Sequence, residues 1–133
     1  MNDALATTAQ MCFDAADAGT MDFPAIVGTL IAAGFEGYDV DYRRGTATYF
    51  RADGDSIQLV SPTLSAPVAA RFDASAIGHA VQAAQSKEAG YTYAEFNARV
   101  QAAGCAGYMV SFLGRRVVYF GRTAETHVEH FPQ

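Results

Sequence analysis

The chain has 133 residues, half of them apolar, and a formal net charge of −5 at pH 7. This length and composition predict one domain whose core needs no metal or disulfide. The negative charge provides no general attraction for nucleic-acid phosphate or anionic lipid, so we expect neither as a partner. The first residues show no basic and apolar leader pattern, and no window is long enough for a membrane span. The cytoplasm is therefore the expected compartment.

The first part of the chain predicts two helices followed by three strands. Asn2 or Asp3 can cap a helix that ends at Gly19, and Asp22 can cap a second helix that ends at Gly34. The apolar period then changes from helical spacing to two, which is typical of a half-buried strand. Strands are expected at about 38–42, 46–51 and 56–60, separated by turns rich in charge and glycine.

The second part of the chain repeats this order at a constant interval. Gly104 follows Gly34 by the same interval at which Tyr108 follows Tyr38, and we call this interval the repeat offset. A register held over such a distance indicates an internal duplication. We predict two repeats, at about 3–60 and 73–131, joined by a connector at 61–72.

The second repeat also begins with two predicted helices. Asp73 can cap the first of them, for which Gly90 is the expected end. Thr92 and Glu95 form a capping-box pattern at the start of the next. The fold class is thus α+β, made of two helix-helix-strands units. We expect the helices to pack on one side of a single antiparallel sheet, with two sheets related by a pseudo-two-fold axis as the alternative.

The two cysteines read as buried free thiols in a reducing compartment. Neither Cys12 nor Cys105 has a CxxC partner or a neighbouring set of histidines. Cys105 aligns with Phe35 at the repeat offset, which favours an apolar packing position over a nucleophile.

The segment 127–130, His-Val-Glu-His, holds the side chains best suited to metal binding or proton transfer. On a strand, His127 and Glu129 point to one side and His130 to the other. Two donors are too few for zinc, and His79 lies on a predicted helix, so we predict no metal site. The sequence holds no phosphate-binding or dinucleotide-binding glycine motif, and no cofactor is expected.

Arginines in corresponding hairpins suggest an anion site, because guanidinium groups bind carboxylates and phosphates with two hydrogen bonds. We expect the symmetry of the repeats to bring arginines of the two halves together, with tyrosine hydroxyls beside them. The alternative is that charged turns only keep the hairpins solvated. The candidate ligand-binding residues are Arg115, Arg116, Tyr119, Arg122, His127 and Glu129.

The chain resembles a family of small bacterial proteins of unknown function, the phage-envelope-protein-like family that includes the YbcV-like proteins. The resemblance is carried by segments 103–110, 114–116, 119–122 and 127–132, and it extends to Phe23-Pro24 and Phe72-Asp73. It implies no activity, because the family has no established one.

Two functions remain open from the sequence. The first is a non-enzymatic binding or regulatory module, a homo-oligomer or an adaptor, that recognises a protein or a small anionic ligand. The second is an anion-binding protein or small enzyme with a pocket between the two repeats, where His127 is the candidate for proton transfer at neutral pH. A structural phage component is a third possibility, which rests on the family label alone.

Overall fold

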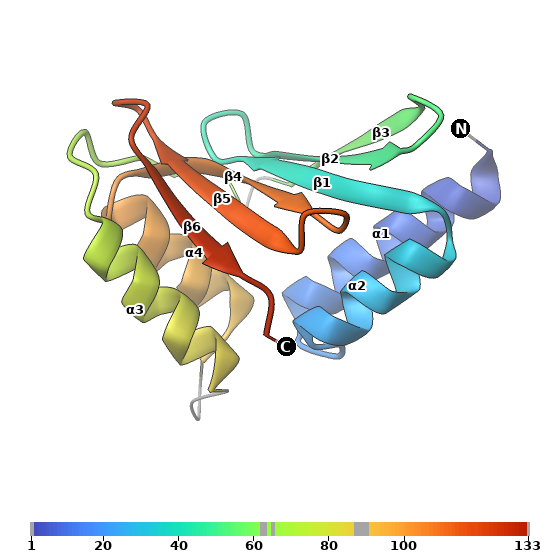
Figure 1. The fold of residues 1–133 in the computed structure, drawn as a ribbon, viewed down its shortest axis with the longest axis horizontal. Helices are drawn as coiled ribbons and strands as arrows, with labels where there is room; N and C mark the ends of the chain where they lie inside the picture. Colours follow the sequence, from blue (N-terminus) through green and yellow to red (C-terminus); the bar gives the residue numbers. More distant parts are fainter. Residues whose placement is uncertain (1, 62–63, 65, 87–90, 133) are drawn as a thin grey trace.

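A computed structural model of the chain describes residues 2–61, 64, 66–86 and 91–132. Each half contains two helices followed by three strands (Figure 1). The first half holds α1 (Asp3–Ala18), α2 (Phe23–Ala32), β1 (Phe35–Asp41), β2 (Thr46–Arg51) and β3 (Ser56–Val60). The second half holds α3 (Ala74–Gln85), α4 (Tyr93–Ala102), β4 (Cys105–Ser111), β5 (Arg116–Gly121) and β6 (Thr126–His130).

The strands form one antiparallel sheet in the order β3-β2-β1-β4-β5-β6. The halves join at its centre, where β1 pairs with β4 and Asp39 lies opposite Met109. The helices lie on one side of the sheet, α1 and α2 under the first half and α3 and α4 under the second (Figure 1). The predicted α+β class, with helices packed on an antiparallel sheet, is confirmed.

The helix caps follow the sequence signals. The side chains of Asn2, Asp22 and Asp73 each accept a backbone N–H at the start of their helix. The Thr92 hydroxyl accepts the N–H of Glu95, as the capping-box pattern predicts. Helix α3 ends at Gln85, and the predicted end at Gly90 lies outside the described residues.

The central strands begin earlier than the alternating pattern suggests. Strand β1 starts at Phe35 and β4 at Cys105, and each has a register shift over its first residues, where a bulge ends at Gly37 or Gly107. A bulge interrupts the alternation of inward and outward residues, which is why the pattern in the sequence starts only at the following tyrosine.

The core lies between the sheet and the helices and is rich in tyrosine. The Tyr42 hydroxyl donates to the Asn97 side chain over 2.6 Å, and the hydroxyls of Tyr93 and Tyr108 are 2.8 Å apart. These contacts satisfy polar groups that would otherwise be costly to bury. Four tyrosines at equivalent positions of the two halves are also buried: Tyr38, Tyr49, Tyr108 and Tyr119.

The outer strand pairs of the two halves share one register. Tyr49 lies opposite Ile57 in the first half, and Tyr119 lies opposite His127 in the second, again separated by the repeat offset. Each residue of β3 therefore has a positional equivalent in β6. The common origin of the halves remains a prediction from the sequence.

Candidate functional site

The structure divides the six candidate residues between three places. Tyr119, His127 and Glu129 lie together on the side of the sheet that faces the helices. Arg116 begins β5 with its side chain exposed, while Arg115 and Arg122 lie in the turns before and after that strand. The cations and the His-Glu pair therefore do not form one site.

His127 and Glu129 form a half-buried pair between β6 and α3. Their Nε2 and Oε1 atoms are 2.9 Å apart, and 26% and 31% of the two side chains are exposed. The pair lies against Gly78 of α3, where an added Cβ would make ordinary contacts of 3.6 Å with the imidazole and 3.7 Å with the carboxylate. The His127 ring also lies 6.3 Å from that of Tyr119. Inward-pointing charged residues on an edge strand discourage pairing with a further strand, which explains the pair without a ligand.

Arg115 holds the C-terminal segment. Its φ angle is 50°, a left-handed conformation that glycine takes at the equivalent position 45. Its carbonyl accepts the N–H of Phe131, its guanidinium donates to the carbonyl of Pro132 over 3.2 Å, and it lies 5.6 Å above the Phe131 ring. The Phe131 ring also packs edge-on against Phe23 of α2 at 5.4 Å. The visible role of Arg115 is to fasten this segment across to the first half.

The other arginines contact their own surroundings. Arg122 donates to the carbonyl of Val68 in the connector, and Arg116 donates to that of Gly114 within its own turn. The expected gathering of arginines from the two halves does not occur. Because β1 and β4 run antiparallel, with Asp41 opposite Gly107 and Gly37 opposite Ser111, the two hairpin turns lie at opposite ends of the sheet.

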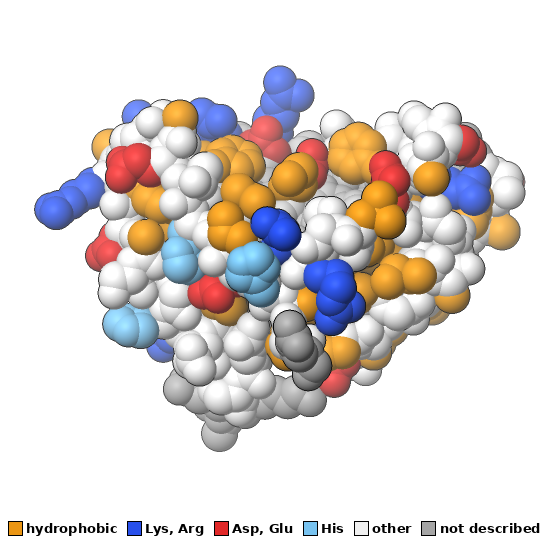
Figure 2. All heavy atoms as spheres, in the orientation of Figure 1, with side chains coloured by type: hydrophobic (Ala, Val, Ile, Leu, Met, Phe, Trp, Pro, Cys, Tyr) orange, Lys and Arg blue, Asp and Glu red, His pale blue; other side chains and the backbone are white. Residues whose placement is uncertain are grey.

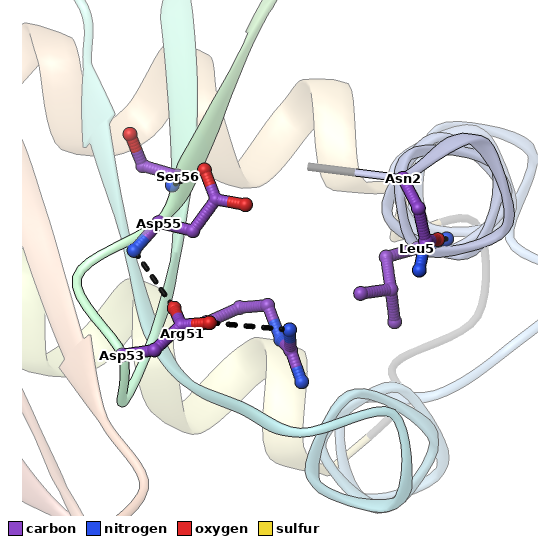
Figure 3. Close-up of polar contacts among 6 residues, drawn as sticks. All are labelled: Asn2, Leu5, Arg51, Asp53, Asp55 and Ser56. Atoms are coloured by element: carbon purple, nitrogen blue, oxygen red, sulfur yellow. Dashed lines mark hydrogen bonds and ion pairs between the residues drawn. The ribbon is translucent and has the colours of Figure 1, made fainter.

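Arg51, the last residue of β2, also serves its own half. It forms an ion pair of 3.5 Å with Asp53, whose carboxylate accepts the N–H of Asp55 (Figure 3). The guanidinium covers Gly34, where a Cβ would lie 2.7 Å from the nearest nitrogen. At the equivalent place in the second half, Phe72 of the connector packs against Gly121.

Both cysteines are buried free thiols, as predicted. Burial raises the pKa of the Cys105 thiol to about 11 and raises that of Cys12 as well. Because the thiolate is the nucleophilic form, these environments oppose nucleophilic chemistry at neutral pH. Within the described residues, no group of three or more His, Cys, Asp or Glu side chains could hold a metal ion.

Two shallow hollows lie away from the six candidate residues. One is open along α1, and the other, of about 300 Å³, lies between the connector and α4. No helix among the described residues is long and apolar enough to cross a membrane.

The side of the sheet that faces away from the helices, here called the outer face, carries a feature that the sequence reasoning missed. One row of neighbouring residues crosses all six strands through the register of the sheet. In the first half this row is polar, and in the second half it is apolar. From β3 to β6 its members are Gln58, Thr48, Asp39, Met109, Val118 and Val128.

The apolar half of this row continues into Phe120. Its ring lies over Gly107, where a Cβ would be 2.7 Å from the ring. Met109 and Val128 are 45% and 41% exposed. We call Met109, Val118, Phe120 and Val128 the apolar patch. The signal was present in the sequence, because the row members of the two halves are separated by the repeat offset and change from polar to apolar.

Charged residues border the apolar patch. Asp39 and Asp41 point outward from β1 on one side, while Arg116 and His130 lie at the ends of β5 and β6 on the other. Burial raises the pKa of the Asp39 carboxyl, and Asp39 has no hydrogen-bond or ion-pair partner in the part of the chain that the structure describes. Basic and histidine side chains lie close to apolar ones around β6 and the neighbouring end of β5 (Figure 2).

Comparison with known proteins adds no assignment. No model of a known protein family matches the chain, and no curated protein is significantly similar to it. Membership of the phage-envelope-protein-like family therefore stays a prediction from the sequence.

Proposed function

We propose that the protein is a non-enzymatic binding module that docks another protein surface on the outer face of its sheet, through the apolar patch. The observation that carries this proposal is the exposure of Met109 and Val128 in a continuous row with Val118. An antiparallel sheet with one solvated face ordinarily shows polar residues on that face. The first half follows this rule along the row and the second half does not.

The chemistry of the patch suits a protein partner. Methionine adapts its shape to an opposing surface, and aromatic residues and arginine are enriched where proteins meet. Phe120 and Arg116 supply both at the patch and its rim. Contiguous exposed apolar side chains rimmed by polar ones are typical of interaction sites.

The alternative, an anion pocket or small active site between the halves, has less support. Arg116 and Arg122 lie in different places from the His127–Glu129 pair, and that pair satisfies its own hydrogen bond. The two hollows described above are lined by other residues, so we do not carry the alternative further.

Site-specific photo-crosslinking tests the proposal. A photoreactive phenylalanine analogue replaces Met109 on the outer face, and in a matched control it replaces Gln82, which is exposed on α3. In cells that naturally contain the protein, we expect a discrete protein adduct from position 109 and none from position 82. The adduct should be lost when Val128→Asp is added. The absence of an adduct at position 109, or the same adducts from both positions, would contradict the proposal.

A further inference from the structure

We propose that the partner of the outer face is a second copy of this chain, bound about a two-fold axis that passes over β4 between Met109 and Ser111. This inference rests on the proposed role of the outer face as a docking surface. It goes further because it names the occupant and the pairs of residues that meet.

The position of the axis follows from the register of the sheet. Strand β4 lies between β1 and β5, with Asp39 beside Met109 and Arg116 beside Ser111. The midpoint between Asp39 and Arg116 therefore falls over β4. A two-fold axis in the plane of the interface at this midpoint sets each Asp39 against the partner's Arg116. Both charges of the pair are supplied twice, as a two-fold interface requires.

The same axis forms a second pair that was not used to place it. With strands about 4.8 Å apart and a rise of about 3.4 Å per residue, His130 falls within one strand spacing of the partner's Asp41. Asp41 lies one strand from Gly107, and His130 lies one strand beyond Arg116. The outer face is thus self-complementary, with Asp39 and Asp41 on one side of the axis and Arg116 and His130 on the other. The Asp41 carboxylate also pairs with Arg44 of its own turn at 3.7 Å, so the Asp39–Arg116 pairs carry the charge complementarity.

The apolar patch lies around this axis. Met109 comes to lie between the partner's Met109 and the partner's Val118, and Phe120 comes to lie beside the partner's Phe120. The strands of the two sheets cross steeply, in the manner of orthogonal sheet packing. Asp39 has no hydrogen-bond or ion-pair partner within the described chain, and in the dimer it pairs with the guanidinium of the partner's Arg116. The net charge of −5 on each copy opposes association, and the Asp-Arg pairs offset that repulsion locally.

Charge reversal tests the arrangement. Sedimentation equilibrium of the full chain should show a reversible dimer. Asp39→Arg and Arg116→Asp should each weaken it at least tenfold, because each variant sets like charges together twice. The mixture of these two variants should dimerise again, and so should the double variant that carries both changes. In each case an acidic residue faces a basic residue in both pairs. Gln58→Arg, on the outer face of β3 and away from the axis, should leave the dimer unchanged. Far-UV circular dichroism and urea midpoints establish that each variant is folded.

The outcomes separate this inference from the proposed function. A monomer at concentrations up to about 1 mM, a dimer insensitive to Asp39→Arg, or failure of the mixture to dimerise would overturn the second-copy inference. If position 109 then crosslinks to a different protein, the docking function stands and only the identity of the partner falls. If position 109 crosslinks to nothing, both fall. A crosslinked product of twice the chain mass together with charge-reversal rescue supports both.

Discussion

The two halves have the same order of elements and the same outer-strand register, yet at several equivalent positions one half has a polar side chain where the other has an apolar one. On the outer face, Asp39 in the first half corresponds to Met109 in the second. On the side that faces the helices the difference is reversed, because Leu59 of β3 corresponds to Glu129 of β6. The second half has a polar pair between its sheet and α3, and an apolar patch on the outer face.

This difference separates what the fold requires from what it leaves free. The fold requires the alternation of inward and outward residues on the central strands, and both halves keep it with Tyr38 and Tyr108 buried. The outer positions carry no such constraint, since a folded sheet tolerates either polarity there. Val60 of β3 is also exposed on this face, at 71%, but only the second half carries neighbouring apolar side chains along the row, and docking explains why they are adjacent.

The largest expected contrast between the halves concerns their paired glycines, Gly34 and Gly104. Both have φ near +90°, but a Cβ on Gly104 would overlap the backbone of Arg71 and Phe72, whereas one on Gly34 would meet only the end of the Arg51 side chain. We expect Gly104→Ala to cost about 4 kcal/mol or to prevent folding, and Gly34→Ala to cost about 1–2 kcal/mol. Urea unfolding followed by circular dichroism measures both. Equal losses would show that the connector does not pack on Gly104 as described.

The edge strands provide the next contrast. Leu59 is 8% exposed, so Leu59→Glu would bury a carboxylate without a partner and should cost about 2–4 kcal/mol. Glu129→Leu at the equivalent position should change stability by less than about 1 kcal/mol, because 31% of that side chain is exposed. Leu59→Met serves as the volume-matched control, with an expected loss below about 1.5 kcal/mol. A Leu59→Glu loss no larger than that of the control would refute the contrast.

The turns before β3 and β6 give a smaller and reciprocal effect. Gly54 and Ala124 hold equivalent positions with φ of 91° and 67°. Gly54→Ala should cost about 1 kcal/mol through left-handed strain alone, since nothing lies within 4 Å of the added Cβ. Ala124→Gly should relieve similar strain and lose part of the gain to the greater freedom of the unfolded chain, for a net increase of about 0.5 kcal/mol. Thermal unfolding shows the signs, and two changes in the same direction would contradict the shared turn geometry.

The sequence could predict the elements because their signals are local. Asn2, Asp22, Asp73 and Thr92 cap helices wherever the rest of the chain lies, and a period of two marks a strand without reference to its partner. The repeat offset even places the equivalent strands. For the same reason the sequence could predict a single antiparallel sheet and the α+β class.

The grouping of the candidate residues could not be predicted, because it depends on contacts between distant segments. The antiparallel pairing of β1 with β4 decides that the arginine turns lie apart, and no local pattern encodes it. The partial burial of His127 and Glu129 depends on the packing of α3 against β6, which no local pattern in the sequence encodes. The apolar patch differs, since comparison of the halves position by position would have revealed it.

The smallest effect, and the most direct test of the outer face as a site, is the pH dependence of Asp39→Asn. Burial raises the pKa of Asp39 above 3.8 in the folded chain, so the charged form is disfavoured by folding. The cost is fully present above the folded pKa and disappears as the pH falls below 3.8. At protein concentrations too low for association, we expect Asp39→Asn to raise the free energy of unfolding at pH 7 by up to about 0.5 kcal/mol.

That gain should fade on acidification, whereas Met109→Asn at the equivalent position removes no titrating group and should show a difference from the parent chain that does not change with pH. Urea titrations between pH 3 and pH 8 measure both. At concentrations where the chain associates, Asp39→Asn should instead lower the free energy of unfolding. The carboxylate that destabilises the monomer then pairs with the partner's Arg116 across the axis. A gain that persists at every concentration would mean that this carboxylate has no partner in any assembly of the chain.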